Sequence, residues 1–403
     1  SGDTAWMLVS TLLVLLMTLP GLALFYGGLV RTKNLLSVLM QCLISAGAVG
    51  VLWVAFGYSL AFGDGGPMNS FIGNLDMIGL AGITPDSVSG SIPTYVFVMF
   101  QGMFAIITPA LMLGAFAERM RFSAYLAFIT VWLFVVYIPL AHMVWGGGWI
   151  GAQLGAIDFA GGLVVHMSSG FSALVACLFI GPRIGHGREP MPPNNLPFTV
   201  IGAALLWVGW FGFNAGSELA ADGTAALAFI NTNTAAAMAL FTWVAIEWYH
   251  GGHPTALGAA TGAVAGLVAI TPACASVSPV GAIGVGLGAG VICYLAVAVL
   301  KSRMGYDDSL DVFGVHGVGG MWGAVATALF IADWGVVEGV SYVGQIVKQL
   351  ISIGFTAVFA ITLSLLILFV LRAVMGDLRV DEESESLGLD LSEHQESAYG
   401  GQS

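Results

Sequence analysis

Long apolar runs alternate with short polar segments along most of the chain. Each run is close to the roughly 20 residues that a helix needs to cross a hydrocarbon layer. The eighth run is short and rich in Ala and Gly, which favours close packing against other helices over exposure to lipid. The pattern predicts an all-α polytopic membrane protein with eleven transmembrane helices, at about residues 5–30, 36–62, 93–117, 123–142, 160–181, 197–215, 224–248, 255–271, 280–300, 312–332 and 346–372.

The composition supports this class. The 403 residues are 58% apolar and only 8% charged, whereas soluble proteins carry about 25% charged residues. The formal net charge is −12, but seven of the 23 acidic residues fall between Asp381 and Glu396, in a polar tail. This acidity argues against a nucleic-acid partner. The four cysteines are scattered without paired spacing, so no disulfide framework, metal site or cofactor is predicted.

The basic residues predict the orientation of the chain, because Lys and Arg gather on the cytoplasmic side of membrane proteins. With eleven spans and the N-terminus outside, ten of the eleven Lys and Arg fall at inner ends or in inner loops. The exception is Lys348. We therefore expect the N-terminus outside and the C-terminus inside, in the inner (plasma) membrane of a cell.

An internal repeat is also present. The stretch 21–28 in span one resembles the stretch 209–216 in span six, and an Asp…His stretch occurs in both span five and span ten. Because five spans is an odd number, the second half must be inverted, and inverted repeats place a substrate path near the midplane. We expect a transmembrane domain at 1–379, with its subdivisions and the tail as follows: repeat one about 5–182, repeat two about 197–332, a last helix about 346–372 and a cytoplasmic tail 380–403.

Two histidines lie deep inside apolar runs. His166 follows Asp158 by eight residues, about 12 Å along a helix, and His316 follows Asp311 in a similar stretch. An ionisable group at that depth is costly and marks a functional site by default; the alternative is a core histidine with one backbone partner. Burial without a counter-charge disfavours the charged imidazole, so both are expected to be neutral and able to donate at one nitrogen and accept at the other.

Aromatic and hydroxyl residues gather at the predicted outer mouth. Phe104 and Trp145 offer ring faces that attract a small cation by about 0.5–2 kcal/mol. Ser217 offers a hydroxyl acceptor, and Phe213 lies close to it in the sequence. For Trp145 the alternative is a tryptophan of the membrane interface. For Phe104 and Phe213 it is ordinary helix packing.

These residues favour transport over enzyme chemistry. The sequence contains no carboxylate pair, phosphate loop or nucleophile constellation, so an enzyme is the weaker class. An alkali ion is a poor guest, because no ring of carbonyls or carboxylates would replace its water. A substrate that is charged outside and neutral within fits better, and ammonium/ammonia has this property. A channel for another neutral solute, such as water or glycerol, is the remaining rival.

Given these residues, the sequence resembles the ammonium transporter family (Amt/Mep, related to the Rhesus proteins) over essentially its whole length. Two of its motifs, AERMRF and AHMVWGGG, are similar to the bacterial Amt type. The motifs that carry the resemblance are PGLALFYGG (20–28), GAFAERMRF (114–122), IPLAHMVWGGG (138–148), DFAGGLVVH (158–166), GWFGFNAGS (209–217), DVFGVHG (311–317) and GLDLSEHQESAYG (388–400).

The resemblance implies a homotrimer in which each subunit has its own pore. It implies a recruitment site for ammonium (with methylammonium as an analogue), a stacked aromatic gate, twin pore histidines, an aspartate needed for transport and a tryptophan in the pore wall. The recruitment site corresponds to Phe104, Trp145 and Ser217, and the gate to Phe104 and Phe213. The twin histidines are His166 and His316. The aspartate is Asp158, and the tryptophan of the pore wall is Trp210.

The acidic tail resembles the family's cytoplasmic C-terminus. In many bacterial members this region and the inner loops dock a P-II (GlnK-type) signal protein, so P-II is an expected partner here; the alternative is a solvated tail. A minority of relatives are ammonium sensors, and sensing without substantial flux is the alternative function. The resemblance leaves open whether neutral ammonia or ammonia plus a proton is carried.

Overall fold

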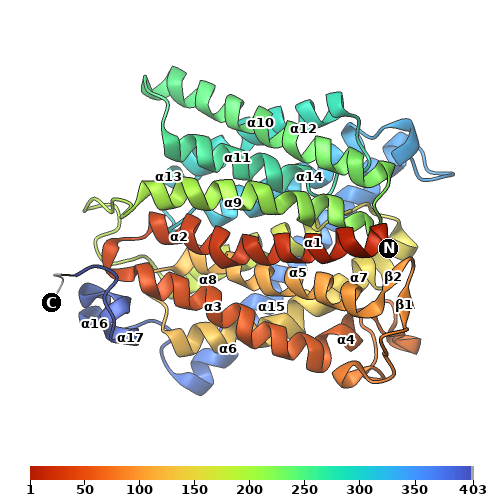
Figure 1. Cartoon of the computed structure of the whole chain (residues 1–403). Coiled ribbons are helices and arrows are strands. Elements are labelled where there is room, and N and C mark those ends of the chain that lie inside the picture. Colours follow the sequence, from red (N-terminus) through yellow and green to blue (C-terminus); the bar gives the residue numbers. More distant parts are fainter. Residues whose placement is uncertain (401–403) are drawn as a thin grey trace.

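A computed structural model, which describes residues 1–400, shows a bundle of roughly parallel and antiparallel helices (Figure 1). Its helices and two short strands are α1 (Gly2–Leu16), α2 (Ala23–Leu29), α3 (Leu35–Leu52), α4 (Tyr58–Phe62), β1 (Val88–Ser89), β2 (Ile92–Pro93), α5 (Thr94–Phe116), α6 (Phe122–Trp132), α7 (Ile138–Trp145), α8 (Ser168–Ile180), α9 (Leu196–Ala215), α10 (Gly223–Gly251), α11 (Ala256–Ile270), α12 (Pro279–Tyr294), α13 (Lys301–Met304), α14 (Val318–Leu329), α15 (Tyr342–Met375), α16 (Glu382–Leu387) and α17 (Leu389–His394).

All eleven predicted spans are helical over most of their length. Within residues 1–400, nine continuous helical segments are long and apolar enough to cross a membrane. The other two are the shorter helix α11 and the segment 313–329, which contains α14. The chain is thus a mostly helical, multi-pass membrane protein, while the full count of eleven crossings stays a prediction. The small hairpin of β1 and β2 in the loop before α5 was not expected.

Several spans are interrupted by π-helical turns. One joins α1 to α2 at Met17–Leu22, where Pro20 lies inside the helix and Leu19 leaves the helical conformation. Two others, Gly162–Met167 and Phe313–Gly317, contain His166 and His316. Such turns are rare and are found frequently at functional sites. Both histidines therefore lie at the start of a helix, in a turn whose backbone hydrogen bonds differ from those of an α-helix.

The two histidine-bearing segments run in opposite directions. Arg183, just after α8, pairs with Asp307, just before the second segment, with a nitrogen–oxygen distance of 2.8 Å. At the other end, the Gln349 amide on α15 bonds the carbonyls of Ile157, before the first segment, and Ala324, within α14. The start of each segment therefore lies near the far part of the other, as the inverted repeat requires for these two elements.

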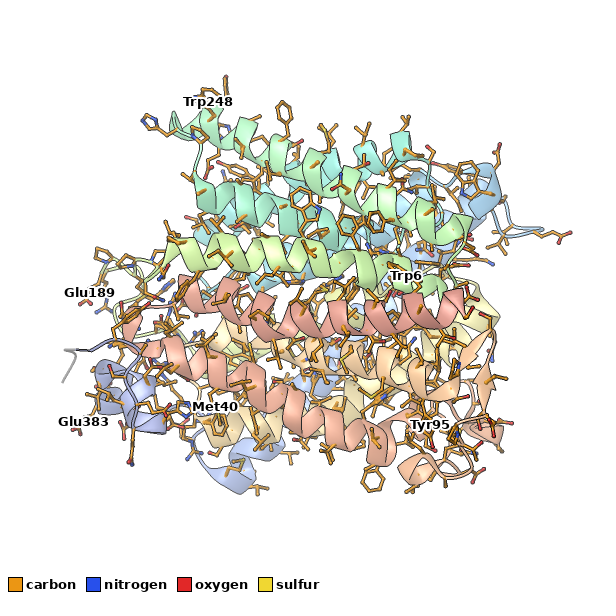
Figure 2. All side chains as sticks on the ribbon, viewed as in Figure 1. Trp6, Met40, Tyr95, Glu189, Trp248 and Glu383 are labelled. Carbon is orange, nitrogen blue, oxygen red and sulfur yellow. The ribbon has the colours of Figure 1, made fainter. Side chains whose placement is uncertain are left out.

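The flanks of the bundle expose apolar side chains. Leu12 is 67% exposed, Val51 70% and Val358 66%, and Figure 2 shows the side chains of the flanks projecting outward, with Met40 among them. A bundle that is apolar all round its flank suits a hydrocarbon surrounding. Glu189 and Glu383 instead lie at one end of the bundle, beyond the apolar flank.

The N-terminus and the tail lie at opposite ends of the bundle (Figure 1). The tail is packed on the chain at its end. The Asp390 carboxylate accepts hydrogen bonds from the backbone N–H groups of Leu36 and Ser37, at the start of α3. Glu385 is buried and pairs with Arg379 at 2.7 Å. The expected tail of 380–403 is thus an ordered cap up to residue 400, and its last three residues lie outside the described part.

Glycines allow the two histidine segments to cross closely. A Cβ on Gly170 of α8 would overlap the backbone of Gly317 in the second segment. Small residues at such crossings let helix backbones approach within a membrane. The crossing therefore depends on the absence of a side chain at Gly170.

We predict that Gly170→Val destabilises the protein by about 1–3 kcal/mol, because the added atoms must push two backbones apart. The measurement is thermal unfolding of the purified protein in detergent. Gly354→Ala on α15 is the matched control, since its Cβ would meet nothing within 4 Å. An equal stability of the two variants would contradict the close crossing.

Candidate functional site

A vestibule opens at the end of the bundle where α7 ends. Its volume is about 350 Å³. Three residues expected to recruit substrate, Phe104, Trp145 and Ser217, all line it. We call it the first vestibule; its wall consists of Phe62, Phe97, Gln101, Phe104, Val144, Trp145, Phe159, Ser217 and Leu219.

The polar atoms of this vestibule are held in place by the backbone. The Trp145 indole N–H donates to the carbonyl of Asp158 at 2.9 Å. The Ser217 hydroxyl donates to the carbonyl of Phe213 at 2.8 Å, which leaves its oxygen free to accept from a guest. The Trp145 ring meets the Phe104 ring edge to face, with centroids 6.1 Å apart. Two aromatic rings and one hydroxyl oxygen are therefore presented together.

Two phenylalanine rings lie between the first vestibule and the next cavity. Phe104 and Phe213 are both fully buried, and their ring centroids are 4.2 Å apart with the planes tilted by 30°. Phe104 lines the first vestibule and Phe213 lines the next cavity. The ring pair therefore lies between the two spaces.

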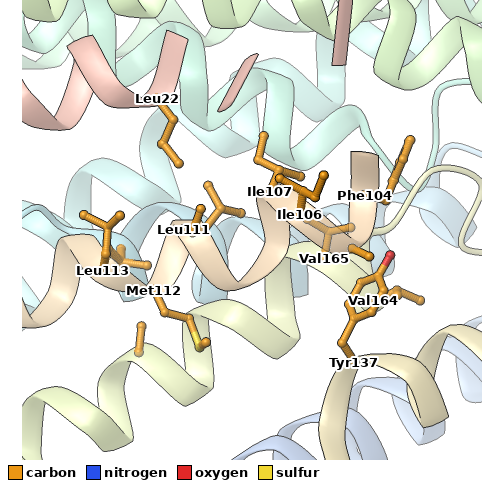
Figure 3. Close-up of a cluster of buried hydrophobic side chains, with 14 of the residues drawn as sticks. Leu22, Phe104, Ile106, Ile107, Leu111, Met112, Leu113, Tyr137, Val164 and Val165 are labelled. Carbon is orange, nitrogen blue, oxygen red and sulfur yellow. The ribbon is translucent and has the colours of Figure 1, made fainter. Parts of the chain in front are cut away.

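Beyond the rings lies a narrow cavity, here called the lumen, of about 10 Å³. That volume is near the minimum that holds one water-sized molecule. Figure 3 shows Leu22, Ile107, Leu111 and Val165 packed here from three separate elements. The lining is Met17, Leu22, Phe25, Ile107, Leu111, Val165, His166, Leu206, Trp210, Phe213, Val264 and His316.

The two histidines contact each other beside the lumen. Their Nδ1 atoms are 3.1 Å apart and the rings are stacked, with centroids 5.3 Å apart. One Nδ1 must donate and the other accept, so the contact suits two neutral rings and opposes two imidazolium ions. His166 Nε2 is buried without a hydrogen-bond partner in residues 1–400. It is a polar atom available to a guest.

Trp210 completes the polar wall. Its ring stacks on that of His166, with centroids 5.4 Å apart. Its indole N–H donates to the Thr271 hydroxyl at 2.9 Å, and that hydroxyl donates to the carbonyl of Leu267. The tryptophan is therefore fixed from behind. Thr271 was not predicted as a site residue, because nothing in the sequence indicates that it contacts Trp210.

The Asp158 side chain is buried and does not line the lumen. Its carboxylate caps the first histidine segment. Its carboxylate accepts hydrogen bonds from four successive backbone N–H groups, those of residues 161–164, at 2.5–3.2 Å. Burial raises the pKa of Asp158, and these amides oppose the rise. The aspartate fixes the start of the helix that carries His166.

The counterpart of Asp158 is Asp308, which corrects our assignment of Asp311. Asp308 is fully buried and accepts from the N–H groups of Val312 and Phe313 at 3.1 and 2.7 Å. Asp311 instead pairs with Lys301 at 2.6 Å and has a positive φ of 61°. The spacing was a usable signal, since Asp308 precedes His316 by eight residues, as Asp158 precedes His166.

A second vestibule of about 430 Å³ lies on the other side of the lumen. His316 and Phe25 line both spaces. Its wall carries the carboxylates of Glu247 and Asp311. The passage therefore runs from the first vestibule, past the two rings and the histidines, to a polar opening. No group of three or more His, Cys, Asp or Glu within residues 1–400 is arranged to hold a metal.

This architecture defines the class: a multi-pass helical membrane protein with a narrow, histidine-lined cavity between two vestibules. The chain belongs to the Ammonium Transporter Family, whose sequence model matches residues 5–399. The expected resemblance is confirmed.

Known relatives match over nearly the full chain. An ammonium transporter of Bacillus subtilis (strain 168) is 50% identical over 405 residues, covering 99% of this chain and 98% of that protein. A solved structure described as "Sensor Amt Protein" has a TM-score of 0.91 at 30% identity and covers 98% of each chain. The structure of Saccharomyces cerevisiae Mep2 has a TM-score of 0.87 at 36% identity, covering 95% of this chain and 88% of that one.

We predict that Asp308→Asn changes how stability depends on pH. Burial, with the nearby Asp311, raises the pKa of Asp308 from 3.8 to about 6, although Lys301 and two amides oppose this. The folded protein then binds a proton more tightly than the unfolded one, so stability is greatest below about pH 4 and falls as pH rises to 6.

The thermal midpoint of the wild type should therefore fall by a few degrees between pH 4 and 6 relative to that of Asp308→Asn. Thermal unfolding in detergent measures both profiles. Asp158 titrates in both proteins, so its effect cancels in the difference. Parallel profiles would contradict the buried, titrating carboxyl.

Proposed function

We propose that this protein transports ammonium or ammonia across a membrane. Its family and relatives named as ammonium transporters support this function. The observation that carries it is the contact between His166 and His316 beside a cavity for one small molecule, between two vestibules. Transport, and not catalysis, is the role that these features favour.

Recruitment takes place in the first vestibule. Ammonium lies against the faces of Phe104 and Trp145 and donates a hydrogen bond to Ser217. The three side chains line one space, which supports this step. Methylammonium can use the same contacts, with its methyl group toward a ring.

Ammonium then loses its proton before it crosses the lumen. The lumen has apolar walls apart from His166, His316 and Trp210, and the indole N–H of Trp210 is already bonded to Thr271. Too few acceptors remain to replace the water around a cation, so a charged guest is disfavoured there. Neutral ammonia can donate to one ring nitrogen and accept from another. Phe104 and Phe213 move aside as it passes.

Asp158 supports transport by holding the helix start that presents His166, and its carbonyl fixes Trp145. The proton either stays outside or follows along the histidine pair. In the first case transport is electroneutral, and in the second the net species is ammonium. A current therefore separates the two cases.

The assembly and its partners follow from the family. We propose a homotrimer in the inner (plasma) membrane, with eleven crossings, the N-terminus outside and the tail inside. A P-II (GlnK-type) signal protein then docks at the end that carries the tail and the loop after α8. Exposed residues 187–190 of that loop and the exposed acids of α16 offer a polar surface for it.

An ammonium sensor is the second candidate function. The solved structure described as "Sensor Amt Protein" matches 98% of this chain, which favours keeping this alternative. A sensor would bind ammonium in the first vestibule and signal through the C-terminal region without substantial flux.

The test is solid-supported-membrane electrophysiology on proteoliposomes. We expect a transient current on an ammonium pulse, a smaller one with methylammonium and none with potassium. Saturable ammonium binding without current, together with no uptake of labelled methylammonium, would favour the sensor. A pH-independent flux of water or glycerol would favour another neutral-solute channel.

We predict that His166→Ala and His316→Ala each reduce the ammonium-specific current about tenfold or more, because the lumen loses its hydrogen-bonding path. His253→Ala is the matched control, since His253 is exposed in the loop after α10. Wild-type currents in both pore variants would remove the histidines from the mechanism.

A further inference from the structure

One buried glutamine on the last long helix bonds the loop that begins the first histidine segment. Gln349 on α15 is fully buried. Its Oε1 accepts from the N–H of Ile157 at 2.7 Å, and its Nε2 donates to the carbonyl of the same residue at 2.8 Å. The Nε2 also donates to the carbonyl of Ala324 in α14 at 3.0 Å. A single amide thus satisfies three backbone groups, two on the half-buried Ile157 and one in α14.

The loop that Gln349 holds carries the first site residues. Ile157 directly precedes Asp158, whose carboxylate caps residues 161–164 and whose carbonyl receives the Trp145 indole N–H. Ala324 lies two turns beyond His316 in the second histidine segment. The Gln349 amide therefore links three parts of the site: the Trp145 ring of the first vestibule, the Asp158 cap of the first histidine segment, and α14 of the second.

The other capping aspartate is held in the same way from a different element. Arg119, after α5, donates from Nη2 to the carbonyl of Asp307 at 2.7 Å, and from Nη1 to the Ser309 hydroxyl at 2.8 Å. These two residues flank Asp308. In both halves a buried side chain holds the carbonyl immediately before the cap, so this contact is a repeated feature of the passage.

The chemistry of the site requires a primary amide at this position. An apolar side chain would leave one N–H and two carbonyls unpaired in the interior, which is costly. A carboxylate could accept from Ile157 but could not donate to either carbonyl. Gln345, one turn earlier, donates to the Gln349 oxygen at 3.3 Å and to the carbonyl of Gly155 at 3.2 Å, so the orientation of the amide is itself set.

We propose that Gln349 is a positioning residue for ammonium recruitment: it holds Asp158, and through it the Trp145 ring and the start of the His166 helix. The proposal rests on the proposed function. It also gives α15, which lies outside the two repeats, a direct role in the passage.

The test compares Gln349→Met, which keeps the volume, and Gln349→Asn, which keeps the amide but is one methylene shorter. In proteoliposomes both should raise the half-saturating ammonium concentration at least threefold, because Trp145 is no longer fixed. Loss of folded protein alone would lower the maximal current without moving half-saturation. Hydrogen exchange of the segment 158–166 should become at least tenfold faster, because the cap is released.

Gln41→Met on α3 is the matched control, a buried glutamine whose side-chain amide donates to the Ser37 hydroxyl in its own helix. It should leave half-saturation and exchange of 158–166 unchanged.

Unchanged exchange and half-saturation in folded Gln349 variants would overturn the proposal. If the wild type carries no current and takes up no labelled methylammonium, the proposed function fails, and hydrogen exchange still decides whether Gln349 holds the segment. A Gln349→Met protein that does not fold leaves Gln349→Asn to decide.

Discussion

Two helix starts lie buried inside this bundle, and their free backbone N–H groups must find acceptors within the protein. Asp158 meets that need for one segment and Asp308 for the other. A carboxylate there is also favoured by the positive end of the helix. Because each capping aspartate lies eight residues before a histidine and fixes the start of its helix, the caps set where His166 and His316 lie.

The close crossing of the two segments makes the passage narrow. Glycines at the crossing let the backbones approach, and the histidine rings then share one contact at 3.1 Å. Aromatic rings close one side and aliphatic side chains fill the rest, so the lumen is only about 10 Å³. In the proposed function this narrow, mostly apolar lining excludes a hydrated cation by size and offers a bare cation too few acceptors.

The end of the bundle that carries the tail is tied to the same elements. Arg119 is buried and donates to the backbone carbonyl of Asp307 and to the hydroxyl of Ser309, the two residues that flank Asp308. Asp307 pairs with Arg183, which holds the pKa of this carboxyl well below its usual range although burial opposes ionisation. The neighbouring Ile184 donates its N–H to Glu385 of the tail. Contacts thus run without a break from the tail to the Asp308 cap.

The sequence by itself determined the helical segments and the ionisable residues within them, because apolar runs of fixed length and a histidine inside such a run are local signals. It also placed Phe104, Phe213 and Trp145 near one mouth. Tertiary structure showed which acid caps the second segment. The eight-residue spacing favours Asp308, but Asp311 also precedes the run, and folding turns Asp308 toward the amides and Asp311 toward Lys301. Gln349 and its partner Ile157 are 192 residues apart. Periodicity carries no information about such a contact, since it arises only when α15 packs against a loop that is distant in the sequence.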